Sequence, residues 1–158
     1  MHAIKPIGVI LSPFQTIEQM PIQPKGAAGT NGQVQIEDAF LPGLKDLEGF
    51  SHIYLIYSFH KANRTELTVV PFMDTRTRGV FATRSPLRPN HIGISIVRLE
   101  KIQDNLLHVL DIDVLDGTPL LDIKPYMEKF DAVENSTSGW MQASDREVAE
   151  KRSDDRFK

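Results

Sequence analysis

Apolar residues recur at every second position along much of this chain, and this period limits its folding most. The pattern is clearest in residues 92–99 and 106–115, where aliphatic side chains alternate with glycine, serine or aspartate. Successive side chains of a strand point to opposite faces, so the period indicates strands with one buried face. The polar residues 101–105 between the two segments predict a hairpin.

The same pattern predicts further short strands and one closed sheet. The predicted strands are 7–11, 34–36, 52–59, 67–70, 79–83, 92–99 and 106–115, with loops at 21–32 and 41–49. Many short strands with frequent turns predict a mainly β fold, a small antiparallel single-sheet β-barrel. A capping box at Ser144 to Glu147 predicts a short C-terminal helix. We therefore expect a barrel domain over residues 1–135 and a short helix and tail over 136–158.

Composition excludes several kinds of site. The chain has no cysteine, and its five histidines are scattered, so we expect no metal site. Residues 7–11 form too short an apolar stretch for a signal peptide or a membrane span, which predicts a cytoplasmic protein with no membrane partner. Neither a dinucleotide-binding glycine motif nor a nucleophile elbow is present.

Charge is unevenly distributed along the chain. Residues 60–98 hold seven lysines and arginines against Glu66 and Asp74, although the net charge of the chain is -3. Such a segment is able to present a basic face to a polyanion. The alternative is that these arginines only solvate the surface of a sheet.

Two stretches have the composition of binding loops. Residues 79–93 form a proline-stiffened loop that carries Arg84 and Arg88, and a guanidinium binds carboxylates or phosphates in a bidentate manner. Residues 113–126 contain an Asp-Gly turn with Asp116 and Asp122, which suits a cationic or amine-bearing ligand. The alternatives are arginines bonded to loop carbonyls and a plain Asx turn at Asp116.

The motifs in these two stretches, taken together, closely resemble the TsaA-like family, also called the TrmO family. The resemblance begins at Ile7-Gly-Val-Ile, continues through Phe50-Ser-His and extends to about Asp131. It rests mainly on Gly79-Val-Phe-Ala-Thr-Arg-Ser, Arg88-Pro-Asn, Ile92-Gly, Asp116-Gly-Thr-Pro and Asp122-Ile-Lys-Pro-Tyr126.

The resemblance implies a barrel that binds S-adenosylmethionine without a Rossmann domain and forms a homodimer. It implies a tRNA (adenine-N6)-methyltransferase that acts in tRNA modification on threonylcarbamoyladenosine beside the anticodon. The cofactor contacts that it implies are Pro24, Lys25, Gly26, His60, Lys61, Arg84, Ile94, Leu115, Asp116, Gly117 and Thr118.

Catalysis and RNA binding are assigned from the remaining motif residues. Asp116 and Asp122 are the candidate acceptors for hydrogens of the adenine amine. Arg88, Asn90 and Lys124 are the candidate tRNA contacts, because they lie in the motifs but outside the implied cofactor set. Two alternatives stay open: a methyltransferase acting on another nucleoside or a small metabolite, and a non-catalytic barrel that binds adenosylmethionine or RNA.

Overall fold

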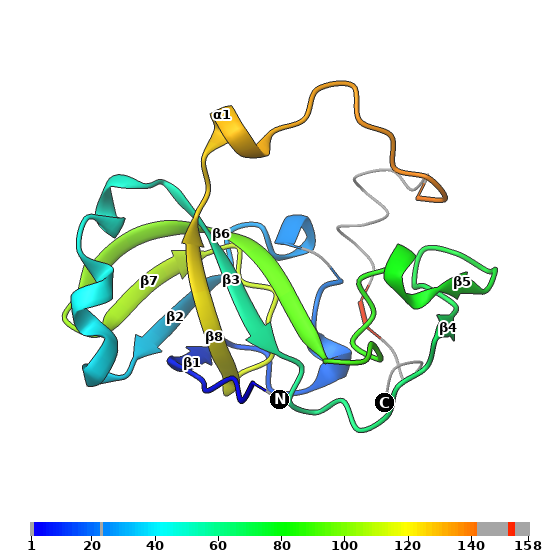
Figure 1. Cartoon of the computed structure of the whole chain (residues 1–158), viewed down its shortest axis with the longest axis horizontal. Helices are drawn as coiled ribbons and strands as arrows, with labels where there is room; N and C mark the ends of the chain where they lie inside the picture. Colours follow the sequence, from blue (N-terminus) through cyan, green and yellow to red (C-terminus); the bar gives the residue numbers. More distant parts are fainter. Residues whose placement is uncertain (1, 23, 142–151, 154–158) are drawn as a thin grey trace.

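The computed structural model describes residues 2–22, 24–141 and 152–153, and its centre is a closed antiparallel barrel (Figure 1). The barrel strands are β1 (Gly8–Leu11), β2 (Asn31–Ile36), β3 (His52–Ser58), β6 (Ile92–Gln103), β7 (Leu106–Leu110) and β8 (Thr118–Pro125). They follow the order β1-β2-β7-β6-β3-β8, and β8 pairs again with β1. Closure leaves no barrel strand with an unpaired edge. The predicted fold class is confirmed.

The core lies inside the barrel and is made of aliphatic side chains from several strands. Its fully buried members include Ile10, Val34, Ile53, Leu55, Val97, Leu107 and Leu120. The predicted hairpin of β6 and β7 is confirmed, although β6 runs on to Gln103 and pairs there with Leu106. Two residues are left for its turn, and Asp104 has a φ of 55°. This hairpin forms the part of the barrel wall beside β2 and β3.

At the start of β6 the buried face is not the apolar face that the alternating pattern indicates. Ile92, Ile94 and Ile96 lie on the outer face and are 37%, 46% and 37% exposed, whereas Gly93 and Ser95 point inward. At this end of the strand the apolar side chains therefore lie on the exposed face, and the buried face carries glycine and serine. The inward positions are glycine and serine because aromatic rings and a polar network fill the space there, as described below.

Two other strand predictions are corrected, and one strand was not predicted. The predicted strand 106–115 ends at Leu110, because Asp111 has a φ of 69° and breaks the extended backbone. Residues 79–83 form mainly a 3₁₀ helix, Val80–Ala82, whose end is capped by a Thr83 hydroxyl donating to the Val80 carbonyl at 2.7 Å. The sequence also did not predict β8, which pairs on both sides within the barrel.

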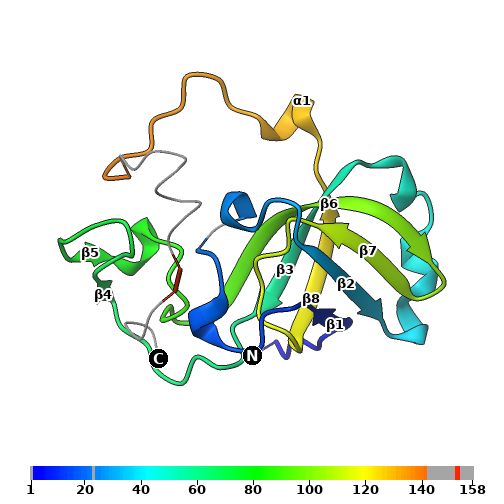
Figure 2. The same ribbon diagram turned by 180° about the vertical axis from the view of Figure 1, so that it is seen from behind.

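The excursion between β3 and β6, residues 59–91, extends from one end of the barrel, as both views show (Figures 1 and 2). It contains the two-stranded ribbon of β4 (Thr68–Val69) and β5 (Arg78–Gly79). A small apolar cluster of Val69, Leu87 and Phe72 holds the excursion together. Its attachment to the barrel end makes it one wall of the site.

The predicted loop 21–32 contains the 3₁₀ helix Pro24–Ala27, but its last two residues belong to β2. The 3₁₀ helices Asp38–Leu44 and Leu47–Gly49 cover most of the predicted loop 41–49. After β8 comes the short helix α1 (Glu128–Asp131), and the chain then arches across to the excursion (Figures 1 and 2). There the Trp140 indole donates to the Ala82 carbonyl at 2.8 Å, with the Arg78 guanidinium 5.8 Å from the ring centroid. The predicted helix at 144–151 lies outside the described residues, and the domain boundary at residue 135 stays a prediction.

Candidate functional site

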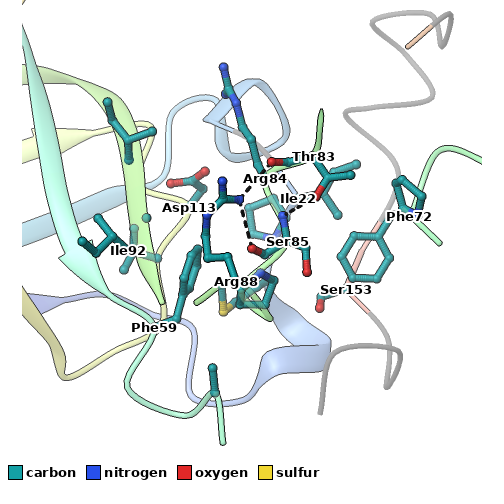
Figure 3. A pocket seen from close by; sticks show the side chains of 18 of the residues that line it. Ile22, Phe59, Phe72, Thr83, Arg84, Ser85, Arg88, Ile92, Asp113 and Ser153 are labelled. Atoms are coloured by element: carbon teal, nitrogen blue, oxygen red, sulfur yellow. Dashed lines mark hydrogen bonds between the residues drawn. The ribbon is translucent and has the colours of Figure 1, made fainter. Parts of the chain in front are cut away.

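A cavity of about 740 Å³ lies between the barrel end and the excursion (Figure 3). Its walls come from the end of β3, the loop 81–88, the start of β6 and the turn after residue 112. Residues 20–22, Ser138, Trp140 and Met141 contribute further lining. The arginine-bearing loop and the acidic turn, which lie far apart in the sequence, therefore border one hollow.

The loop 81–88 is held in shape by its own hydrogen bonds. The Arg88 guanidinium donates from Nη1 to the carbonyl oxygens of Thr83 and Ser85, at 2.9 and 3.3 Å (Figure 3). The buried Ser85 hydroxyl accepts the Leu87 amide hydrogen at 3.1 Å. Because these bonds satisfy the backbone internally, the loop presents the Arg84 side chain to the cavity from a braced backbone.

The opposite wall is a tight turn that leads into β8. Gly117 has a φ of 79°, a conformation that glycine adopts without steric cost, and its amide donates to the Ile10 carbonyl at 2.8 Å. The buried Thr118 hydroxyl donates to the Leu115 carbonyl at 2.6 Å. The Asp116 carboxylate accepts the Ser12 amide hydrogen at 2.9 Å. Asp116 thus braces this turn against the segment that follows β1.

A buried chain of polar groups reaches the cavity from the barrel interior. The Tyr57 hydroxyl lies 2.9 Å from Ser95 Oγ, which donates to Asp113 Oδ1 at 2.6 Å. Tyr57, Ser95 and Asp113 are all buried, and Tyr57 and Asp113 line the cavity. Figure 3 labels Asp113 there. Burial raises the pKa of Asp113 to about 6, opposed by the Ser95 hydrogen bond and the Arg84 charge. Burial also raises the pKa of Tyr57 far above its usual range.

The aromatic wall beside this network depends on a glycine. The Tyr57 and Phe59 rings meet edge to face, with centroids 5.5 Å apart. A Cβ on Gly93 would lie 2.7 Å from Cζ of Tyr57 and 2.8 Å from Cζ of Phe59. Both rings line the cavity. Gly93 is therefore the position at which the rings approach the β6 backbone.

Many of the cofactor contacts implied by the family resemblance line the cavity. They are His60, Lys61, Arg84, Ile94, Leu115 and Thr118. Partial burial and the neighbouring Lys61 charge lower the pKa of His60. Asp116 and Gly117 belong to the same turn but are not among the lining residues. Pro24, Lys25 and Gly26 lie in the 3₁₀ helix Pro24–Ala27.

The candidate catalytic and RNA-binding residues are not gathered in one place. Arg88 lines the cavity, and its bonds to loop carbonyls match the structural alternative considered for it from the sequence. Asp122 and Lys124 lie on β8, 3.4 Å apart between Oδ2 and Nζ, and neither lines the cavity. Asn90 lies in the turn just before β6. The catalytic and RNA-binding roles of this set stay predictions.

Sequence reasoning did not single out the three residues of the buried polar network, Tyr57, Ser95 and Asp113. One signal was present for Asp113, an acidic residue inside the apolar run 112–115. Burial of an aspartate is rare unless it is hydrogen-bonded or functional. The alternating pattern assigned this aspartate to an outer face, and so its burial was not predicted.

The described residues show neither a metal centre nor a membrane-spanning helix. No group of three or more histidine, aspartate or glutamate residues is arranged to hold a metal ion in that part of the chain. Within the same residues, every helix falls short of the length and apolar character that a membrane-spanning helix requires.

A closed barrel with a mixed polar and apolar cavity at one end defines a class of small-ligand-binding β-barrel proteins. Residues 9–132 match the tRNA-methyltransferase O N-terminal domain. The chain belongs to this family.

Named relatives and solved structures agree with this assignment. A Probable S-adenosyl-L-methionine-binding protein of Pyrococcus abyssi is 49% identical over 157 residues, 99% of this chain and 85% of the relative. The mouse (Mus musculus) tRNA (adenine(37)-N6)-methyltransferase is 35% identical over 138 residues, 83% of this chain and 32% of the mouse protein. A crystal structure of TrmO from Pseudomonas aeruginosa has a TM-score of 0.75 and 39% identity, covering 89% of this chain and 62% of that one. This chain thus spans less than two thirds of the Pseudomonas chain and about a third of the mouse protein.

Proposed function

We propose that this protein binds S-adenosylmethionine and transfers its methyl group to the amino nitrogen of an adenine in tRNA. The acceptor that we propose is the threonylcarbamoyl-modified adenosine next to the anticodon. The observation that carries the proposal is the cavity shared by the Arg84 loop and the turn at 113–118. The names of the Pyrococcus and mouse relatives support the cofactor and the reaction.

The residues of the cavity suit adenosylmethionine. The volume of about 740 Å³ lies within the range of small-molecule and cofactor sites. Arg84 and Lys61 offer cationic groups to the carboxylate of the methionyl part. Apolar side chains of Phe59, Ile94 and Leu115 offer surfaces to the adenine ring and the methylene carbons. We propose that these residues, with His60 and Thr118, hold the cofactor.

The remaining implied cofactor contacts are proposed on the family resemblance alone. They are Pro24, Lys25, Gly26, Asp116 and Gly117. Bound adenosylmethionine supplies an electrophilic methyl group, so the protein needs to contribute orientation and exclusion of water. The braced loop 81–88 and the turn at 113–118 suit this task because their backbone groups are bonded within the protein.

We also propose that the tRNA approaches the cavity from the arginine-bearing loop. If Arg88 contacts a phosphate, Arg88→Ala should weaken tRNA binding. The slope of log Kd against log salt concentration should fall by about 1, the contribution of one phosphate contact. Because Arg88 also braces its loop, the variant's affinity for adenosylmethionine is measured as well. Filter binding across salt concentrations gives the slope. An unchanged affinity with an unchanged slope would remove Arg88 from the RNA face.

The homodimer and the cytoplasmic location are also proposals. They rest on the family resemblance and on the sequence alone. Of the exposed isoleucines on the outer face of β6, Ile92 and Ile94 line the cavity, and we assign Ile94 to the cofactor.

The test of the reaction is methyl transfer from labelled adenosylmethionine to two matched tRNA pools, with and without the threonylcarbamoyl group. We expect label only in the modified pool, on the adenine amino nitrogen, as nucleoside mass spectrometry will show. Label in both pools would contradict the proposed acceptor. Cofactor binding without label in either pool would favour a non-catalytic binding barrel, and label in a small metabolite would favour the other alternative.

A further inference from the structure

We propose that the carboxylate of Asp113 accepts the proton that the adenine amino nitrogen loses when it is methylated. This inference rests on the proposed function and adds a catalytic residue to it. Asp113 is 7% exposed and lines the cavity that we assign to the cofactor (Figure 3). A buried carboxylate at a ligand cavity is costly, and such groups are typical of functional sites.

The direction of the hydrogen bonds makes Asp113 the terminal acceptor of its network. A serine hydroxyl has one hydrogen, and that of Ser95 is donated to Asp113 Oδ1 at 2.6 Å. The Tyr57 hydroxyl, 2.9 Å from Ser95 Oγ, therefore acts as the donor in its own bond. Both hydroxyls thus stabilise the ionised form of Asp113, and the carboxylate keeps further lone pairs for a hydrogen of a ligand.

The two aspartates proposed from the sequence are less suited to this task. Asp116 accepts the Ser12 amide hydrogen at 2.9 Å and the Gln15 side-chain amide at 3.4 Å. Asp122 is ion-paired with Lys124 and accepts the Ile123 amide hydrogen. Neither is among the residues that line the cavity, whereas Asp113 is.

The amino nitrogen of the adenine forms a bond to the methyl carbon while the carbon–sulfur bond of the sulfonium breaks, and the sulfur keeps that electron pair. The nitrogen then carries one hydrogen too many for a neutral product. That proton goes to the Asp113 carboxylate, which becomes a carboxylic acid and later releases the proton to water.

The ionisation of Asp113 suits a proton acceptor near neutral pH. Its pKa is raised to about 6 by burial, so the carboxylate is ionised at pH 7 yet more basic than an exposed one. Ser95 on β6 and Arg84 in the excursion act on this carboxyl group directly, and Tyr57 on β3 is hydrogen-bonded to Ser95. Among the residues that the structure describes, the other charged or titratable groups lining the same cavity are His60, Lys61 and Arg88.

The first test compares Asp113→Asn with Asp104→Asn. Asp104 lies exposed in the β6–β7 turn, so its variant makes the same chemical change away from the cavity. With wild-type protein we expect kcat to rise with pH through a midpoint near the Asp113 pKa of about 6. Asp113→Asn should lower kcat by roughly 100-fold or more and remove this rise. Adenosylmethionine affinity, measured by calorimetry, should stay close to that of the wild type, and Asp104→Asn should match the wild type throughout.

A second variant separates a catalytic role from a structural one. Ser95→Ala removes the hydrogen bond that favours the ionised form of Asp113, so the pKa of Asp113 should rise. The midpoint of the rate profile should shift to higher pH, and activity should recover on the alkaline side. The ¹³C NMR resonance of the Asp113 carboxyl carbon, followed in protein without cofactor, should show the same shift.

The outcomes distinguish this inference from the proposed function. If wild-type protein methylates no tRNA, the proposed function fails and the inference fails with it. If the wild type is active and Asp113→Asn keeps its kcat and its pH profile, only the inference is overturned. A rate profile whose midpoint does not follow the carboxyl titration in Ser95→Ala would also overturn it.

Discussion

Replacing Gly93 with valine should lower the free energy of unfolding by about 3 kcal/mol, the upper part of the range for overpacking a filled site. A Cβ at this position would lie 2.7 Å from Cζ of Tyr57 and 2.8 Å from Cζ of Phe59. The rings have to move away from the β6 backbone, and the Tyr57–Ser95 hydrogen bond is then lost. Since both rings line the cavity, we also expect loss of adenosylmethionine binding.

Urea denaturation and calorimetry measure these two effects. The matched control is Gly49→Val, because a Cβ on Gly49 would meet no atom within 4 Å. We expect the control to keep both stability and affinity. A Gly93→Val protein as stable as the control, with normal cofactor affinity, would contradict the ring packing described for this wall.

Asp113→Asn should make the protein more stable at pH 8, by about 3 kcal/mol, even though it impairs catalysis. The pKa of Asp113 is raised by burial from 3.8 to about 6, so the native state favours the neutral carboxyl group. Its contribution to stability is fully present below the unfolded pKa and is lost as pH rises from about 4 through about 6. Asparagine stays neutral and avoids this loss.

The test is urea unfolding of wild type and Asp113→Asn at several pH values between 3.5 and 8. The stability difference should be near zero at the acid end and largest above the native pKa, because other titrating groups cancel in the comparison. A difference that does not change with pH would show that Asp113 is not buried as a carboxyl group with a raised pKa.

The period of the strands made the barrel predictable, but not the direction in which every strand faces. In β6 the isoleucines at 92, 94 and 96 face outward, while Gly93 and Ser95 occupy the inward positions. The Tyr57 ring packs on Gly93 there, and Ser95 donates a hydrogen bond to Asp113. A glycine and a serine therefore occupy inward positions that usually carry aliphatic side chains. The hydrophobicity of the segment alone cannot show that its less apolar face is the buried one.

Two other differences have local causes. β8 begins with Thr118 and Pro119, contains a register irregularity opposite Ile56 and Tyr57, and therefore lacks an even alternation. It is a strand because β1 and β3 pair with it on both sides. The residues that follow Gly79 are extended in the sequence prediction but form a 3₁₀ helix, because Thr83 caps it and the loop closes on itself.

Residues of both segments singled out from the sequence line the cavity, but the buried network between them was not predicted. Motif residues such as Arg84 and Thr118 do line the cavity. Tyr57, Ser95 and Asp113 come from β3, β6 and the turn after β7, and only the barrel brings them together. Contacts of this kind depend on strand register, which no single segment of sequence specifies.

The central claim is that the hollow between the Arg84 loop and the turn at 113–118 is the site for adenosylmethionine. A crystal structure of the protein with S-adenosylhomocysteine, the demethylated product, tests this claim most directly. We predict that the ligand lies in that hollow, with its carboxylate toward Arg84 and its sulfur facing the space beside Asp113. A ligand bound on another face of the barrel, with the hollow left to water, would contradict the account.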